Sequence, residues 1–171
     1  PGLAACGFFY PGSVTWAFGV HALALEVDVE TGALRLLRYA VVHDCGEPIN
    51  LMIVEGQLHG GLAQGLGSAL AEQLVHDAVG QLLTGTFMDY ALPRADDIPP
   101  LAVEHLVFPS IVNPLGIKGV GESGIIPTAA AVANAVEDAL ADRGVEVDEV
   151  PLTPGKVFAL LRGAAGRATS G

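Results

Sequence analysis

The chain has 171 residues, of which 51% are hydrophobic, and it carries a formal net charge of −11. This length is sufficient for one domain with its own hydrophobic core. The acidic excess argues against nucleic acid or an anionic membrane as a partner, because both are bound through basic patches. Residues 1–25 carry no charged side chain, but prolines and glycines interrupt them, so we expect neither a signal peptide nor a membrane span. The two cysteines, Cys6 and Cys45, lack a C-x-x-C spacing, and a reducing, cytoplasmic compartment is expected.

The amino-terminal part is predicted to form a loop followed by a β-hairpin. Residues 1–16 are interrupted by glycine and proline and are expected to be a loop that continues from a missing amino-terminal portion. Residues 17–29 have the apolar pattern of a strand that is buried on much of both faces. Residues 30–32, Glu-Thr-Gly, are a typical turn, and residues 34–43 are expected to return as the second strand.

A glycine-rich helix is predicted from Asn50, a good N-cap residue, to about Leu74. A glycine inside a helix costs about 1 kcal/mol relative to alanine, so several together need a reason. The pairs Gly56/Gly60 and Gly61/Gly65 are each four residues apart, so each pair clears one face of the helix. Two interpretations remain open: a ligand that approaches the helix, or tight packing against another part of the chain.

The rest of the chain is predicted to contain further short elements, namely a hairpin at 74–86, an irregular segment at 87–100, a strand at 101–108 and helices at 127–141 and 154–161. The first of these helices is rich in alanine and has only a narrow polar stripe, so we expect it to be mostly buried. Together the elements predict one α+β domain over residues 17–162, with mixed sheet hairpins, a glycine-rich helix and a buried alanine-rich helix. Residues 163–171 are expected to form a flexible tail.

Residues 116–124 hold four glycines around a single carboxylate, that of Glu122. Glycines permit positive φ and a close approach of the backbone to another group. Pro127 follows and suits the first turn of a helix. The segment matches neither G-x-x-x-x-G-K-[ST] nor G-x-G-x-x-G, and a carboxylate would repel phosphate. A catalytic glutamate framed by glycines and an ordinary tight turn with a solvated glutamate both remain open.

Side-chain metal ligation is not predicted, because the five histidines have no H-x-x-x-H spacing and none pairs with a cysteine. There is also no G-x-S-x-G sequence of a serine hydrolase. Gln57 presents a carboxamide, which is both donor and acceptor, at the glycine-cleared start of a helix. Such a group suits the edge of a heterocycle such as a pterin, although a polar helix residue without a function is equally compatible with it.

In their order along the chain, these motifs resemble a known family. They are Gly19-Val20-His21, Glu30-Thr31-Gly32, Asp44-Cys45-Gly46, Asn50, Gly56-Gln57-x-x-Gly60-Gly61-x-x-Gln64-Gly65, Asp89-Tyr90-x-x-Pro93 and Lys118-Gly119-Val120-Gly121-Glu122. From about Phe18 to Leu161 the sequence resembles the C-terminal part of the large, molybdopterin-binding subunit of the xanthine oxidase family of molybdenum hydroxylases. The similarity is greatest to carbon monoxide dehydrogenase-like and aldehyde or N-heterocycle hydroxylase large chains.

The resemblance implies roles for particular residues. It aligns Glu122 with the glutamate that acts as the base and deprotonates a molybdenum-bound hydroxyl. Gln57 aligns with the glutamine that hydrogen-bonds the pterin, and the glycines at the cofactor would be Gly56, Gly60, Gly61 and Gly121. The cofactor would be molybdopterin cytosine dinucleotide, with iron–sulfur clusters and FAD on partner chains.

The implied activity is hydroxylation of an aldehyde, an N-heterocycle or a similar carbon centre, with water as the oxygen source. The implied partners are the remaining large-subunit portion, an iron–sulfur subunit and an FAD subunit. One departure from the family is Asn50-Leu51, where Asn-Pro is usual. The alternatives are a truncated, non-catalytic fragment that acts as an interaction module, a carbon monoxide-oxidising subunit, and a nucleotide-binding module at residues 116–124, which the Glu122 carboxylate disfavours.

Overall fold

A computed structural model of the chain describes residues 2–168. In chain order its elements are β1 (Phe18–Val27), β2 (Leu34–Asp44), α1 (Leu51–Leu70), the short 3-10 helix η1 (Ala95–Asp97), β3 (Leu101–Leu106), α2 (Thr128–Ala139), the 3-10 helix η2 (Ala141–Arg143) and α3 (Pro154–Ala168). The described residues therefore form a small mixed α/β domain.

The predicted hairpin of β1 and β2 is confirmed. The two strands pair antiparallel from Phe18 opposite Asp44 to Val27 opposite Leu34. The turn between them needs Gly32, whose φ is +74°, and its amide donates to the carbonyl oxygen of Asp28 at 2.7 Å. Strand β3 then joins the other edge of β2 in parallel, so the sheet is mixed, with the order β1-β2-β3.

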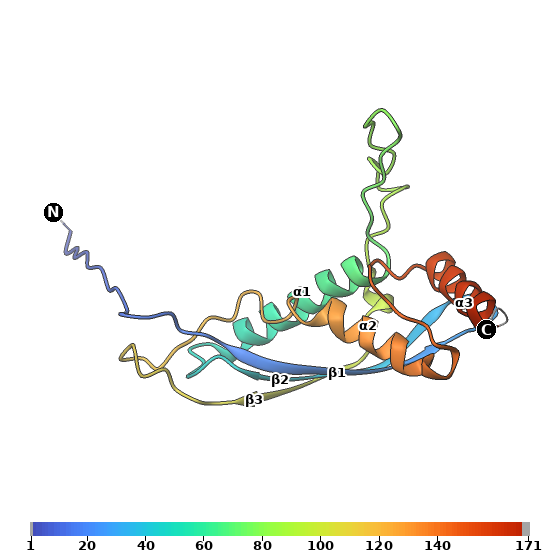
Figure 1. Cartoon of the computed structure of the whole chain (residues 1–171). Helices are drawn as coiled ribbons and strands as arrows, with labels where there is room; N and C mark the ends of the chain where they lie inside the picture. The colour runs from blue at the N-terminus through green and yellow to red at the C-terminus, as the bar shows by residue number, and fades with distance from the viewer. Residues whose placement is uncertain (1, 169–171) are drawn as a thin grey trace.

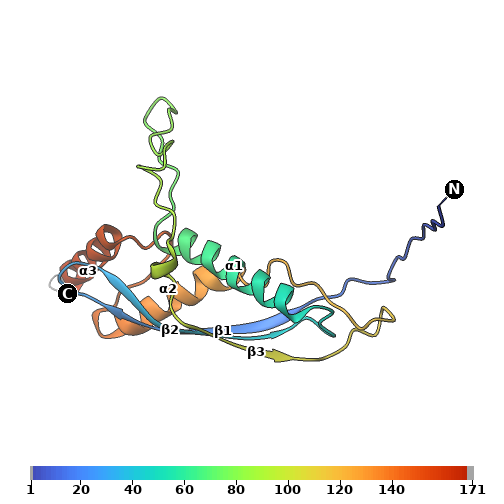
Figure 2. The ribbon, with the colours of Figure 1, turned by 180° about the vertical axis from the view of Figure 1, so that it is seen from behind.

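The helices α1 and α2 cover one face of this sheet (Figures 1 and 2). Residues on β1 alternate accordingly: His21, Leu23 and Leu25 on the helix side are half-buried, whereas Val20 on the other side is 68% exposed. The expectation that this strand is buried on much of both faces is therefore wrong, because the helices of the described residues cover only one face of the sheet.

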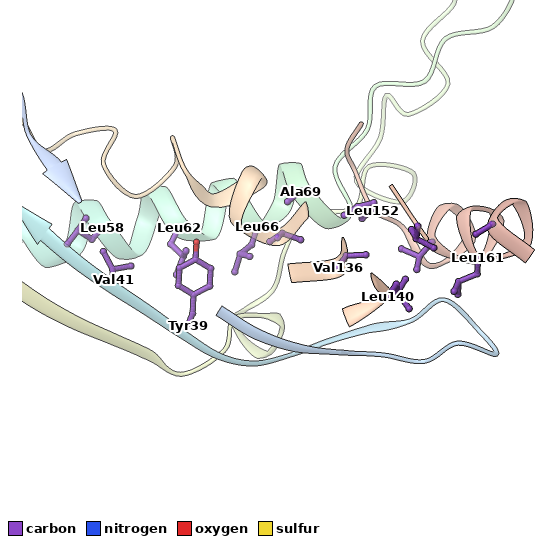
Figure 3. Packing of buried hydrophobic residues seen from close by; sticks show 14 of the residues in the cluster. Tyr39, Val41, Leu58, Leu62, Leu66, Ala69, Val136, Leu140, Leu152 and Leu161 are labelled. Carbon is purple, nitrogen blue, oxygen red and sulfur yellow. The ribbon is translucent and has the colours of Figure 1, made fainter. Parts of the chain in front are cut away.

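The hydrophobic core lies between the sheet and α1 (Figure 3). Leu58, Leu62 and Leu66 follow one another at intervals of one helical turn and are at most 2% exposed. They pack on Tyr39 and Val41 of β2, which are 1% exposed. Val132, Val136, Leu140, Leu152, Val157 and Leu161 extend the same core toward α3.

Helix α1 begins as the sequence predicts. The Asn50 side chain accepts a hydrogen bond from the amide of Ile53 at 3.2 Å, which confirms the predicted N-cap. The helix ends at Leu70, about one turn before the expected end near Leu74. The amide of Glu72 instead bonds the carbonyl of Gly67 at 2.8 Å, and the chain leaves the helix there.

The second predicted hairpin is not a pair of regular strands. Between α1 and η1 the chain forms a long arm that projects away from the helices and the sheet (Figure 1). Its pairing is reduced to one isolated bridge, between His76 and Leu82. With few neighbours, the apolar side chains of Phe87 and Met88 are 89% and 97% exposed.

The two carboxy-terminal helices also differ from expectation. In α2 only Thr128, Val132 and Val136 are fully buried, so the prediction of a mostly buried helix is wrong for its other positions. Its main contacts are with α1 and β1, and Asn134, Asp138 and Ala139 on its other side are exposed. Helix α3 continues to Ala168, so residues 163–168 of the expected flexible tail are helical, and the remainder of that tail lies outside the described residues.

Candidate functional site

The segment that carries Glu122 packs directly against the middle of α1. A Cβ atom built on Gly61 would lie 3.0 Å from the Cα of Gly124, and one built on Gly124 would lie 2.9 Å from the amide nitrogen of Leu62. One turn further along α1, a Cβ on Gly65 would lie 2.6 Å from the Cβ of Thr128. Tight packing against the chain itself therefore explains the pair Gly61/Gly65.

The other glycine pair has a different environment. A Cβ atom built on Gly56 or on Gly60 would meet nothing within 4 Å, and both residues are exposed. Gln57, between them, is exposed as well. The first half of α1 thus presents an open surface with a carboxamide, which is the face on which a flat heterocycle has room to lie.

Glu122 lies near this open surface. It precedes Gly124 by two residues, which span at most about 7 Å. Gly124 in turn contacts Leu58, the neighbour of Gln57. Glu122 is exposed, and a Cβ on Gly121 would also meet nothing within 4 Å. The packing of Gly124 on Leu58 thus holds the segment that carries Gly121 and Glu122 at the turn of α1 that contains Gln57, whereas the Cβ direction of Gly61 is filled by the chain.

Upstream of Glu122 the segment is anchored by a buried ion pair that sequence reasoning did not identify. Lys118 donates a hydrogen bond to the carboxylate of Asp44, whose side chain is 0% exposed. The same carboxylate accepts the amides of Gly46 at 3.0 Å and Phe108 at 2.9 Å. Burial alone would raise the pKa of Asp44, but these hydrogen bonds and the charge of Lys118 together lower it. The pair ties the ends of β2 and β3 to the segment before Glu122.

Downstream of Glu122 a second set of polar contacts holds the backbone. The Thr128 hydroxyl donates to the carbonyl oxygen of Gly124 at 2.7 Å and accepts a long hydrogen bond from the Tyr39 hydroxyl at 3.4 Å. The Tyr39 hydroxyl lies 2.9 Å from Nδ1 of His21. Burial lowers the pKa of His21, and a hydrogen bond with the backbone of Ser123 opposes that effect. These residues lie on three elements, β1, β2 and α2, and the sequence offers no local motif that joins them.

Two further histidines lie beneath the start of α1. His43 is 1% exposed, its ring lies 6.3 Å from that of His105, and none of their ring nitrogens has a hydrogen-bond partner among the described residues. Glu55 of α1 lies 3.7 Å from Nε2 of His105. Burial lowers the pKa of His43, and the neighbouring His105 adds to the effect.

Other features lie elsewhere or are absent from the described residues. A groove of about 620 Å³ lies at the far end of α1, lined among others by Leu36, Leu66, Leu70 and Leu152, and includes none of the predicted site residues. Within residues 2–168, no group of three or more His, Cys, Asp or Glu side chains is arranged to hold a metal ion. None of the described helices has the length and apolar character needed to cross a bilayer.

Comparison with known proteins identifies the family of this chain. Residues 1–99 match the model of the molybdopterin cofactor-binding domain family, a range that contains Gln57 but not Glu122. The nicotine 6-hydroxylase large subunit of Paenarthrobacter nicotinovorans is 46% identical over 145 residues, which are 85% of this chain and 18% of that subunit. The carbon monoxide dehydrogenase large chain of Hydrogenophaga pseudoflava is 42% identical over 165 residues, or 95% of this chain and 20% of the relative.

A solved structure shows the same fold. Quinoline 2-oxidoreductase from Pseudomonas putida 86 matches with a TM-score of 0.83 and 46% identity, over 85% of this chain and 19% of that one. The chain therefore belongs to the molybdopterin cofactor-binding domains of the large subunits of xanthine oxidase family molybdenum hydroxylases. It spans about a fifth of the length of the relatives that it matches. The resemblance in the sequence motifs is confirmed, and the comparisons do not favour a non-catalytic interaction module.

Proposed function

We propose that this chain forms the part of a molybdenum hydroxylase that supplies the catalytic base, Glu122, and a pterin contact, Gln57. The observation that supports the proposal is the close packing of Gly124 on Gly61 and Leu58, which holds the segment that carries Glu122 against the part of α1 that contains Gln57. We infer from this packing that a carboxylate and a carboxamide 65 residues apart in the sequence share one surface.

The residues at this surface fit a pterin. Gly56 and Gly60 leave free space above α1, so a planar ring system can approach the helix closely. The Gln57 carboxamide can donate and accept hydrogen bonds at the ring edge, as a pterin requires. Gly121 leaves similar space beside Glu122. We propose molybdopterin cytosine dinucleotide as the form of the cofactor, which would supply a redox-active metal and an oxygen atom derived from water.

Glu122 would act as the general base in this site. A base must lie within about 2.6–3.2 Å of the proton-bearing atom that it serves. An exposed carboxylate on a glycine-flanked segment can meet that requirement once substrate and cofactor are bound, and it would accept the proton of the attacking oxygen. Because relatives with 46% identity carry nicotine and quinoline in their names, we propose that the substrate is an N-heterocycle, an aldehyde or a similar carbon centre. Carbon monoxide is the alternative.

The remaining large-subunit portion is the partner that we propose for the exposed apolar end of the domain. The start of β1, the start of α1 and the end of β3 meet there, and the following side chains are all at least 53% exposed: Trp16, Phe18, Ile49, Met52, Phe108 and Ile111. Exposed apolar side chains that gather at one end of a domain are typical of an interface. Iron–sulfur and FAD subunits would accept the electrons, and we expect the complex to be cytoplasmic.

The test is the substitution Glu122→Gln in the assembled enzyme. Turnover of a panel containing nicotine, quinoline and benzaldehyde, with a redox dye as electron acceptor, should fall by about a hundredfold or more, because a positioned general base contributes that much. The control is Glu104→Gln, which changes an exposed carboxylate on β3. Full activity of Glu122→Gln with any panel substrate would remove Glu122 from the role of base.

A further inference from the structure

We propose that Thr128, with Tyr39 and His21 behind it, is a positioning residue that fixes the segment carrying Glu122. The inference rests on the proposed function, in which Glu122 is the base. Residues 121–127 form consecutive turns outside any helix or strand, and Glu122 has a glycine directly before it and another two residues after it. Such a backbone has many accessible conformations, so it needs external contacts to hold one of them.

Thr128 supplies the first contact. Its hydroxyl donates to the carbonyl oxygen of Gly124 at 2.7 Å, two residues beyond Glu122. Thr128 is 0% exposed, so this bond forms away from water. Its Cβ and Cγ2 fit into the notch left by Gly65, where a Cβ atom would lie within 3.0 Å of both. The notch restricts the threonine rotamer and thereby the direction of the hydroxyl.

Tyr39 and His21 extend the network to the sheet. The Tyr39 hydroxyl donates to the Thr128 hydroxyl at 3.4 Å and lies 2.9 Å from Nδ1 of His21. The hydroxyl that holds the Gly124 carbonyl oxygen, on the carboxyl side of Glu122, is therefore itself held by side chains of β2 and β1. A misplacement of about 1 Å at a reacting group can lower a rate about a hundredfold, so these contacts have a catalytic consequence.

The experiment compares Thr128→Val, which keeps the shape but removes the hydroxyl, with Thr128→Ser, which keeps the hydroxyl. In the assembled complex, Thr128→Val should lower kcat about tenfold while KM and molybdenum content stay at the wild-type level. Hydrogen exchange of peptides covering residues 119–126 should become faster. Thr128→Ser should have the kcat and the hydrogen exchange rate of the wild type. The control Thr31→Val, which changes an exposed threonine in the β1–β2 turn, should alter neither quantity.

The inference is overturned if Thr128→Val has the hydrogen exchange rate and the kcat of the wild type. It is also overturned if Thr128→Ser shows the same changes as Thr128→Val. If Thr128→Val does not assemble, Tyr39→Phe removes the hydroxyl that holds Thr128 from the sheet, and unchanged exchange of residues 119–126 in that variant overturns the inference. An active Glu122→Gln enzyme would instead refute the proposed function, and faster exchange in Thr128→Val would then still establish the structural contact.

Discussion

Lys118 and Asp44 form an ion pair with little access to water, since their side chains are 11% and 0% exposed. Replacing one partner of such a pair leaves an uncompensated charge in a medium of low polarity, which typically costs about 3–5 kcal/mol. The pair joins the ends of two strands to the Glu122 segment. Its loss should therefore affect the stability of the domain as well as the site.

We expect Lys118→Met to lower the free energy of unfolding by about 3–5 kcal/mol, measured by urea denaturation. The matched control is Lys156→Met, since Lys156 pairs with Glu149, whose side chain is 70% exposed. Loss of that pair should cost less than about 1 kcal/mol. Equal effects of the two substitutions would contradict the structural role assigned to Lys118.

We predict that the folded domain loses stability in acid because of His43. Its pKa is lowered in the folded chain from an ordinary value of 6.5, chiefly by burial and then by His105, while Asp44 opposes the shift. The unfolded chain therefore binds more protons as the pH falls below 6.5, and stability that is complete above that pH is lost toward acid. His21 also adds to the effect on His43, and Glu55 lies beside His105.

The corresponding measurement is the midpoint of thermal unfolding at about pH 8 and about pH 5 for the wild type and for His43→Leu. The difference between the two pH values should be smaller in the variant, because it has no imidazole at this buried position to protonate. An identical pH dependence in both proteins would show that His43 does not control acid stability.

The site residues differ in how far the sequence could predict them. Glu122 and Gln57 stand out locally, because each is a polar group among glycines, and their roles remain predictions. Asp44, Thr128 and Tyr39 were not identified, because their contacts join β2, α2 and the Glu122 segment, and only tertiary structure brings these together. A lysine in a glycine-rich segment was the one available signal for Lys118.

Among the elements, α1 uses glycine both for close packing against the chain and to leave an open surface. Gly61 and Gly65 allow the Glu122 segment and α2 to approach the helix, whereas Gly56 and Gly60 face open space. Spacing alone left both interpretations open, and the structure assigns packing to the second pair. The same limitation explains the errors for β1 and α2, because composition does not reveal which faces of an element receive neighbours.

The two kinds of glycine should respond in opposite ways to alanine. Gly65→Ala would bring a Cβ to 2.6 Å from that of Thr128, and overpacking of this kind costs about 1–3 kcal/mol. Gly56→Ala meets nothing within 4 Å and should stabilise the helix by up to about 1 kcal/mol. Urea denaturation of the two variants measures both effects, and a stabilising Gly65→Ala would contradict the packing described for α1.

In the molecule as a whole, one hydrophobic core supports two surfaces, the candidate site and an exposed apolar surface. The covered face of the sheet, with α1 and α2, holds the core. The candidate site lies on the first half of α1, toward the end of the domain at which this helix begins. That same end of the domain exposes the aromatic and aliphatic side chains assigned above to an interface. The partner proposed above for this apolar surface would lie next to the candidate site.

The most direct test is to measure the molybdenum and cytidine nucleotide content of the purified complex. The measurement is made for the wild type and for two variants in which a glutamine is replaced by alanine. We predict about one molybdenum and one released nucleotide per large subunit in the wild type, and lower retention of both in Gln57→Ala. The control Gln73→Ala changes an exposed glutamine beyond the far end of α1 and should retain the wild-type content. A well-folded wild-type complex with neither molybdenum nor nucleotide, or full retention in Gln57→Ala, would contradict the account.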